Sequence, residues 1–104
     1  MKPIQEFKFF QELCSLEGLD KIWLFGSRAR GDYGERSDID LAIKLSKDNP
    51  KQRLFISNII EEADTLLKID IIYLNDPLDD RFLALFNNDK VLLFDHEKPL
   101  LSHH

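Results

Sequence analysis

The sequence predicts an α/β (α+β) fold in which helices cover a small mixed β-sheet. Apolar runs of strand length alternate along the chain with longer segments whose apolar residues recur every three or four positions. The chain has 104 residues, of which 43% are apolar and 32% are charged, as is usual for one globular domain. We therefore expect a single domain over residues 1–104, with residues 97–104 as a frayed tail.

The first helix is expected over residues 3–17. Pro3 fits a first helical turn, and Gly18 fits the position just after a helix end. The apolar residues of this segment follow helical spacing: Ile4, Phe7, Phe10 and Leu13. This helix should pack its apolar side on the sheet.

A strand over residues 19–25 and a tight turn come next. The strand ends in the apolar run Ile-Trp-Leu-Phe and should be covered on both faces. Gly26 lets the backbone approach a ligand closely, and Ser27 can cap a short helix over residues 27–30. Free N–H groups at a helix start attract anions, and Arg28 and Arg30 add positive charge that suits phosphate oxygens. The turn is therefore a candidate phosphate site.

A second strand over residues 36–45 carries two acidic residues. Side chains alternate along a strand, so Asp38 and Asp40 share one face while Ile39 and Leu41 share the other. Two positions along a strand span roughly 6.5 Å between Cα atoms. Carboxylates at this spacing can converge on one or two divalent ions, and all-oxygen ligation suits Mg²⁺. In the loop before this strand, Tyr33 either stacks on a nucleobase or has no function.

The longest helix is expected over residues 51–68, after a turn in which Asp48 or Asn49 is the cap. One apolar stripe predicts the side that packs on the sheet: Phe55, Ile59, Ala63 and Leu66. The acidic residues of this helix should form its solvated side: Glu61, Glu62 and Asp64.

A third strand over residues 69–74 is apolar except for Asp70. A lone carboxylate in such a run is costly to bury unless it is paired or binds a metal, so Asp70 is the natural third ligand. A helix over residues 78–86 follows, capped by Asp76-Pro77, with Phe82, Leu85 and Phe86 facing inward. Residues 90–95 form either a last strand or an extended segment against a helix.

Bulk properties exclude several classes of protein. The net charge of −5 argues against broad nucleic-acid binding, although residues 21–36 hold four basic and two acidic side chains. No apolar run approaches the ~20 residues that span a bilayer. Cys14 is the only cysteine, and the N-terminus lacks the apolar core of a signal peptide. We expect a cytoplasmic protein without a membrane partner.

The combined motif resembles that of a known family. A Gly-Ser pair followed after ten residues by Asp-x-Asp is similar to the signature of nucleotidyltransferases of the DNA polymerase beta type. Because the chain is short, it resembles the minimal nucleotidyltransferases, which are stand-alone catalytic domains. The likeness has motif quality over residues 21–73, and it implies the polymerase-beta-like sheet with three carboxylates on one side.

The resemblance implies specific roles for the site residues. Gly26 and Ser27 would hold the β- and γ-phosphates, with Arg28 or Arg30 nearby, while Arg36 would steer phosphate or pair with Glu35. The metal ligands and catalytic residues would be Asp38, Asp40 and Asp70. The first two would bind both of two Mg²⁺ ions, for which Mn²⁺ could substitute; Asp70 would bind one and be available as a base. The reaction would transfer a nucleoside monophosphate, AMP from ATP, to a hydroxyl.

The resemblance also implies a partner. Minimal nucleotidyltransferases often pair with a small helical HEPN-type protein and act as its antitoxin, some by transferring AMP to a tyrosine. Nothing in 104 residues remains to bind an acceptor, so we expect a second chain, in a homo- or hetero-oligomer. Two alternatives stay open: a non-catalytic module that binds nucleotide or partner, and a metal-dependent sugar-nucleotide transferase.

Overall fold

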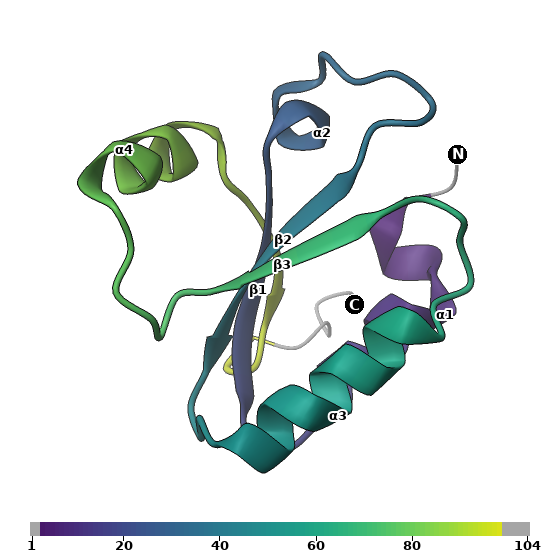
Figure 1. The fold of residues 1–104 in the computed structure, drawn as a ribbon, viewed down its shortest axis with the longest axis vertical. Coiled ribbons are helices and arrows are strands. Elements are labelled where there is room, and N and C mark those ends of the chain that lie inside the picture. Colours follow the sequence, from purple (N-terminus) through teal and green to yellow (C-terminus); the bar gives the residue numbers. More distant parts are fainter. Residues whose placement is uncertain (1–2, 99–104) are drawn as a thin grey trace.

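The computed structural model describes residues 3–98, which form a four-stranded mixed sheet with helices on both faces (Figure 1). The strands are β1 (Leu19–Phe25), β2 (Ile39–Leu45), β3 (Ile69–Tyr73) and β4 (Val91–Asp95), in the order β3-β2-β1-β4. β1 is antiparallel to both β2 and β4, whereas β2 and β3 are parallel. The predicted fold class is confirmed, and of the two alternatives for residues 90–95 the structure shows a strand, over residues 91–95.

The helices are η1, a 3-10 helix (Ile4–Glu6), α1 (Lys8–Cys14), α2 (Ser27–Arg30), α3 (Pro50–Glu61) and α4 (Asp80–Asp89). Figure 1 shows α1 and α3 together on one side of the sheet and α4 on the other. The short α2 follows β1 directly, at the end of the sheet where β2 begins. This end of the sheet therefore holds the predicted site.

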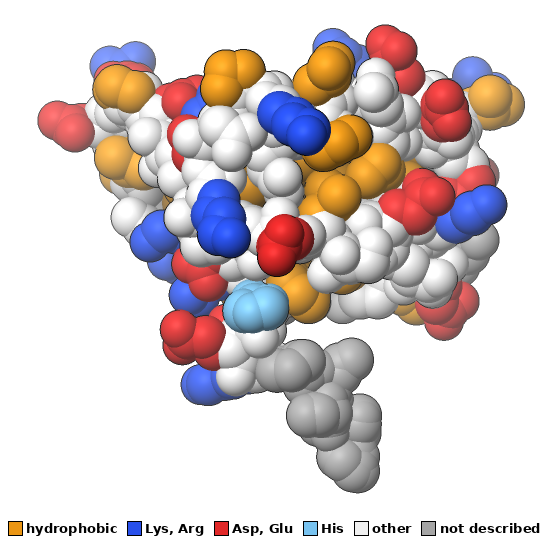
Figure 2. All heavy atoms as spheres, turned by 90° about the horizontal axis from the view of Figure 1, so that it is seen from below, with side chains coloured by type: hydrophobic (Ala, Val, Ile, Leu, Met, Phe, Trp, Pro, Cys, Tyr) orange, Lys and Arg blue, Asp and Glu red, His pale blue; other side chains and the backbone are white. Residues whose placement is uncertain are grey.

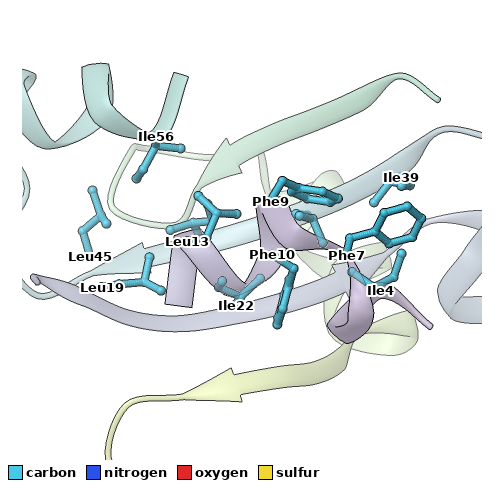
Figure 3. Close-up of a cluster of buried hydrophobic side chains, with 12 residues drawn as sticks. Ile4, Phe7, Phe9, Phe10, Leu13, Leu19, Ile22, Ile39, Leu45 and Ile56 are labelled. Carbon is cyan, nitrogen blue, oxygen red and sulfur yellow. The ribbon is translucent and has the colours of Figure 1, made fainter. Parts of the chain in front are cut away.

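The main core lies between the sheet and the pair α1 and α3 (Figure 3). Ile22, Leu41 and Ile43 point from the sheet into this layer and are fully buried. Side chains of the two helices close it from the other side: Phe9, Phe10, Leu13 and Ile56. Side chains alternate between the two faces of a strand. Trp23, Phe25 and Asp40 therefore point to the opposite face of the sheet.

That opposite face is covered by an aromatic cluster under α4. The Phe82 and Phe86 rings of α4 meet the Phe25 ring edge-on, with centroids 5.5 and 5.8 Å apart. The Trp23 ring meets Phe86 in the same way at 6.0 Å. Both faces of β1 are thus covered, as the sequence predicts. The prediction that Leu85 faces inward is wrong, since 62% of its surface is exposed.

The helix predicted over residues 3–17 is split in two. Phe7 has extended backbone angles (φ −74°, ψ 140°) between η1 and α1. The Asp64 carboxylate accepts hydrogen bonds from the Lys8 and Phe9 N–H groups, both at 3.1 Å, and so satisfies donors at the start of α1. Asp64 is therefore not part of a solvated helix side, and the predicted helix over residues 51–68 ends at Glu61.

Two other element starts were predicted too early. β2 begins at Ile39 rather than at residue 36, so Asp38 lies just before the strand. α4 begins after Asp79, three residues beyond the predicted cap, and extends to Asp89. Of the two predicted caps of α3, Asp48 and Asn49, the structure shows Asn49. Its side chain accepts a hydrogen bond from the Gln52 N–H at 2.8 Å.

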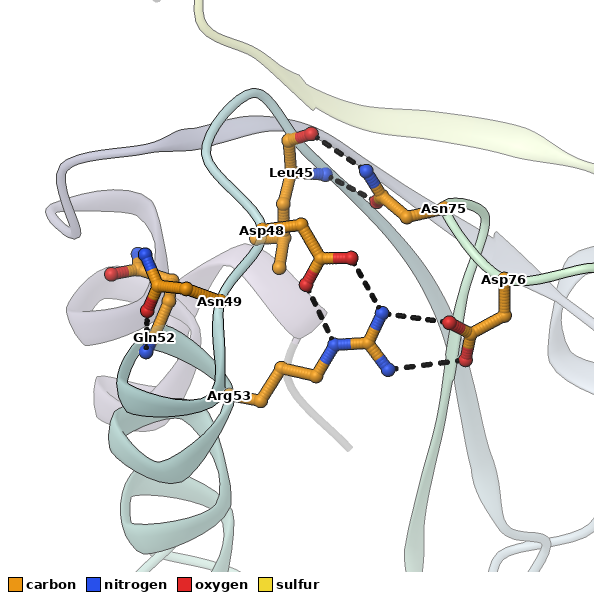
Figure 4. A network of polar contacts seen from close by, with 7 residues as sticks. All are labelled: Leu45, Asp48, Asn49, Gln52, Arg53, Asn75 and Asp76. Atoms are coloured by element: carbon orange, nitrogen blue, oxygen red, sulfur yellow. Dashed lines mark hydrogen bonds and ion pairs between the residues drawn. The ribbon is translucent and has the colours of Figure 1, made fainter.

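A polar network fixes the end of the sheet remote from the site (Figure 4). Arg53 of α3 binds Asp48 and Asp76 at once, with closest N–O distances of 2.7 Å to each. The Asn75 side-chain amide donates to the Leu45 carbonyl and accepts from the Leu45 N–H. It thus pairs with the last residue of β2 as a neighbouring strand would. These contacts join α3 to the segment after β3.

The surface seen in Figure 2 carries acidic and basic side chains interspersed around a group of hydrophobic ones. Within residues 3–98, no helix has the length and apolar character needed to cross a membrane. The predicted tail falls largely on residues 99–104, which lie outside the described residues.

Candidate active site

Two of the three predicted acids are direct neighbours across the sheet. Asp40 of β2 is aligned with Asp70 of the parallel strand β3, so their side chains leave the same face. Asp40 is also paired with Phe25 of β1. A row of Asp70, Asp40 and Phe25 therefore runs across three strands. It lies on the face that α4 covers, at the end of β1 where Gly26 follows.

Gly26 allows the chain to turn directly beside the Asp40 carboxylate. Its φ of 77° lies in a region that L side chains rarely adopt, and a Cβ at this position would overlap Asp40 Oδ2. The Gly26 carbonyl accepts from the Ala29 and Arg30 N–H groups, both at 3.1 Å, and opens α2. Gly26, not Ser27, therefore occupies the N-cap position. Ser27 is the first helical residue and is partly exposed.

The three acids share one electrostatic environment. Partial burial, followed by repulsion from Asp70 and Asp38 and a hydrogen bond with Asp70, raises the pKa of Asp40. Lys68 opposes this rise in the pKa, and its Nζ lies 3.6 Å from Asp70 Oδ1. Asp38 is exposed at the mouth of the site. The site thus concentrates negative charge at a place where a bound cation would be stabilised.

The donor chemistry fits a hard divalent cation, since carboxylate oxygens are the ligands of Mg²⁺ and Mn²⁺. The room that Gly26 leaves beside Asp40 and the repulsion among the acids agree with that use. Nevertheless, within residues 3–98 no group of three or more His, Cys, Asp or Glu side chains is arranged so that it could hold a metal ion. The ligand roles of Asp38, Asp40 and Asp70 remain predictions.

Arg28 is used differently from what the sequence predicts. Its side chain is buried, and its Nη2 donates to the Ser37 carbonyl at 2.8 Å. Its Nε donates to the carbonyls of Ser37 and Asp38 at 3.1 and 3.2 Å, and its guanidinium lies 4.7 Å from the Tyr33 ring centroid. A phosphate contact would cost these bonds, so the structure favours Arg28 as the residue that positions the loop before β2.

The other predicted cations remain on the surface. Arg30 pairs with Asp32 and with Asp89 of α4, each at 3.2 Å, and lines a pocket beside Gly26. Arg36 is exposed in the loop before Asp38. Sequence reasoning missed Lys68, although a lysine two residues before a strand carboxylate lies on the same side when the strand is extended. The phosphate roles of Arg30 and Arg36 stay predictions.

The profile of the family described as polymerase beta, nucleotidyltransferase matches residues 8–99. The chain belongs to this nucleotidyltransferase family. Membership confirms the resemblance drawn from the Gly-Ser and Asp-x-Asp pattern, and it identifies the chain as a transferase.

Two relatives and one structural neighbour are similar to this chain. MJ0141 of Methanocaldococcus jannaschii, which bears the name of a protein adenylyltransferase, is 42% identical over 71 residues, covering 66% of this chain and 69% of its own. A crystal structure from Sulfolobus solfataricus, by name a nucleotidyltransferase, is 30% identical with a TM-score of 0.56, covering 88% of this chain and 78% of that one. The complex of tri-AMPylated Shewanella oneidensis HEPN toxin with MNT antitoxin shares the fold, with a TM-score of 0.56, 16% identity and coverage of 88% and 67%.

Proposed function

We propose that this chain transfers AMP from ATP, with Mg²⁺, to a hydroxyl of a HEPN-type partner protein, as the antitoxin of a toxin–antitoxin pair. The observation that carries the proposal is the alignment of Asp40 with Asp70, with Asp38 adding to the charge at Asp40, directly beside the Gly26 turn. Carboxylates and a close backbone turn are what binding of a metal–triphosphate needs.

In this proposal the acids hold divalent metal, which supplies charge stabilisation at the phosphates and lowers the pKa of the acceptor hydroxyl. The Gly26–Ser27 turn orients the β- and γ-phosphates. The acceptor oxygen forms a bond to the α-phosphorus as the bond to pyrophosphate breaks, and the acceptor proton is released. Arg28 contributes indirectly, through hydrogen bonds that fix the loop that carries Asp38.

The choice of AMP and of a protein acceptor is supported by the relatives. MJ0141 is named for protein adenylylation and shares 42% identity over the matched residues. A structural neighbour of the same fold is found with a HEPN toxin that carries AMP. We extend both the donor and the kind of acceptor to this chain as part of the proposal.

The test is transfer of label from α-labelled ATP to the product of the neighbouring reading frame, the candidate partner, with Mg²⁺ present and then chelated. We expect one labelled partner band that disappears on chelation. The double variant Asp38→Asn/Asp40→Asn should abolish transfer without loss of folding. Its matched control, Glu61→Gln/Glu62→Gln at the exposed end of α3, should retain it. Label on other acceptors but never on the partner would contradict the antitoxin role.

A non-catalytic nucleotide-binding role is the second candidate, favoured by the absence of a compact metal-ligand group within residues 3–98. Titration of ATP with and without Mg²⁺, combined with an assay of pyrophosphate release, separates the two. Binding without release in the presence of the partner would support the binding module and exclude the transferase.

A further inference from the structure

A pocket of about 180 Å³ opens between the end of β1 and α4, immediately beside Gly26. Its walls are apolar: Phe25, Phe82, Leu85 and Phe86. We infer that this pocket binds the base of the nucleoside triphosphate, an inference that rests on the proposed function because it requires the phosphates to lie at the Gly26 turn.

The position of the pocket follows from strand pairing. Phe25 and Asp40 are direct partners across the antiparallel pair of β1 and β2, so their side chains stand next to each other on one face. Gly26 lines the pocket and is also the residue whose missing Cβ leaves room beside the Asp40 carboxylate. If the phosphates of a nucleotide lie at this turn, its base can therefore reach the side of the pocket that Phe25 forms.

The walls suit a flat aromatic ring. The Phe82 and Phe86 rings are nearly parallel, with an interplanar angle of 15° and centroids 6.0 Å apart, while Phe25 meets both edge-on. Aromatic side chains bind nucleobases by stacking, which favours a base over a second charged group here. Leu85 at the rim is 62% exposed, an apolar side chain that a bound ring would cover.

The lining of the pocket also includes a charged pair, Arg30 and Asp89. Arg30 Nη1 lies 3.2 Å from Asp89 Oδ2, and the Asp89 side chain is only 11% exposed. This pair places a carboxylate acceptor and a guanidinium donor within the same pocket as the aromatic rings. Polar groups at the edge of an apolar slot are what orients a base that carries both donors and acceptors.

The test compares binding of Mg·ATP with binding of Mg·tripolyphosphate, which has no base, by calorimetry. Phe82→Ala should weaken ATP binding roughly 5- to 100-fold, the range that loss of one base–aromatic stack produces. It should leave tripolyphosphate binding unchanged. Phe55→Ala, at a phenylalanine that is 44% exposed on α3, is the matched control and should change neither.

Because Phe82 also packs on Phe25 and Phe86, a second variant leaves the aromatic cluster intact. Leu85→Ser removes the exposed apolar side chain that a bound base would cover, and it should weaken ATP binding while the melting temperature stays nearly the same. Unchanged ATP affinity in both folded variants would overturn the inference. The inference would also be overturned if the variants weakened binding of the acceptor protein but not of ATP, because the pocket would then belong to the acceptor site. Failure of wild-type protein to bind tripolyphosphate would instead contradict the proposed function itself.

Discussion

Arg28 Nη2 lies 2.8 Å from the carbonyl oxygen of Ser37, so the short helix α2 holds the chain at the point where it turns towards Asp38. The buried guanidinium donates to the carbonyls of Glu35, Ser37 and Asp38. The Gly26–Ser27 turn and the loop that carries Asp38 are thereby joined by one side chain, although ten residues lie between Ser27 and Asp38.

Substitution Arg28→Met should lower both stability and activity. The variant leaves partly buried carbonyls without their charged donor, a loss of roughly 1–3 kcal/mol in the free energy of unfolding. Urea denaturation measures this change. Arg30→Met, which removes ion pairs of a solvent-exposed guanidinium, should lower the free energy of unfolding much less, because solvent screens such pairs. Equal stability of the two variants would contradict the positioning role.

Replacing Gly26 with alanine should remove nucleotide binding as well as stability. The backbone conformation of Gly26 (φ 77°, ψ −156°) alone costs about 1–3 kcal/mol for an L side chain, and the added Cβ also overlaps the Asp40 carboxylate. Gly31→Ala is a matched control, because Gly31 has a φ of 88° but nothing within 4 Å of the added Cβ. We expect the control to lose stability and keep ATP affinity, as measured by calorimetry.

Asp40→Asn should raise the melting temperature at neutral pH. The pKa of Asp40 is raised in the folded protein, so its favourable contribution is present below the ordinary aspartate pKa and is lost as pH rises through the folded value. At neutral pH the ionised carboxylate opposes folding, and the amide does not. The gain should vanish near pH 3, where both forms are neutral. Melting curves at the two pH values check this, with Glu12→Gln on exposed α1 surface as control.

Asp64→Ala should destabilise the protein by about 0.5–2 kcal/mol, the usual cost of losing a side chain that satisfies N–H groups at a helix start. Chemical denaturation gives the value, and hydrogen exchange at Lys8 and Phe9 should speed up locally. Glu62→Ala, two residues away and exposed, should have little effect. An equal loss in both variants would mean that the contact with α1 is not the cause.

β1 and β3 were predictable because each has a local signature, whereas β2 begins three residues later than predicted and the last strand was one of two alternatives. β1 has the predicted bounds, and Asp70 drew attention as a lone carboxylate in an apolar run before its alignment with Asp40 was known. Helix ends were less predictable. The apolar spacing of α3 continues beyond Glu61, yet the helix ends there, and Asp64 instead accepts hydrogen bonds from α1 residues more than 50 positions away. Local spacing carries no sign of that contact. The role of Arg28 was likewise hidden, since a basic residue in a turn has the same local pattern whether it meets phosphate or carbonyls.

The order of the strands determines from which side of the sheet another protein can reach the site. Within residues 3–98, β3 has β2 as its single neighbour and so forms a border of the sheet, while β2 lies inside it. Asp40 lies on β2, which has a neighbouring strand on each side, whereas Asp70 lies on the edge strand β3. A protein that docks along this border would meet free backbone groups of β3 and reach the third carboxylate first, without disturbing the packed layer beneath α1 and α3.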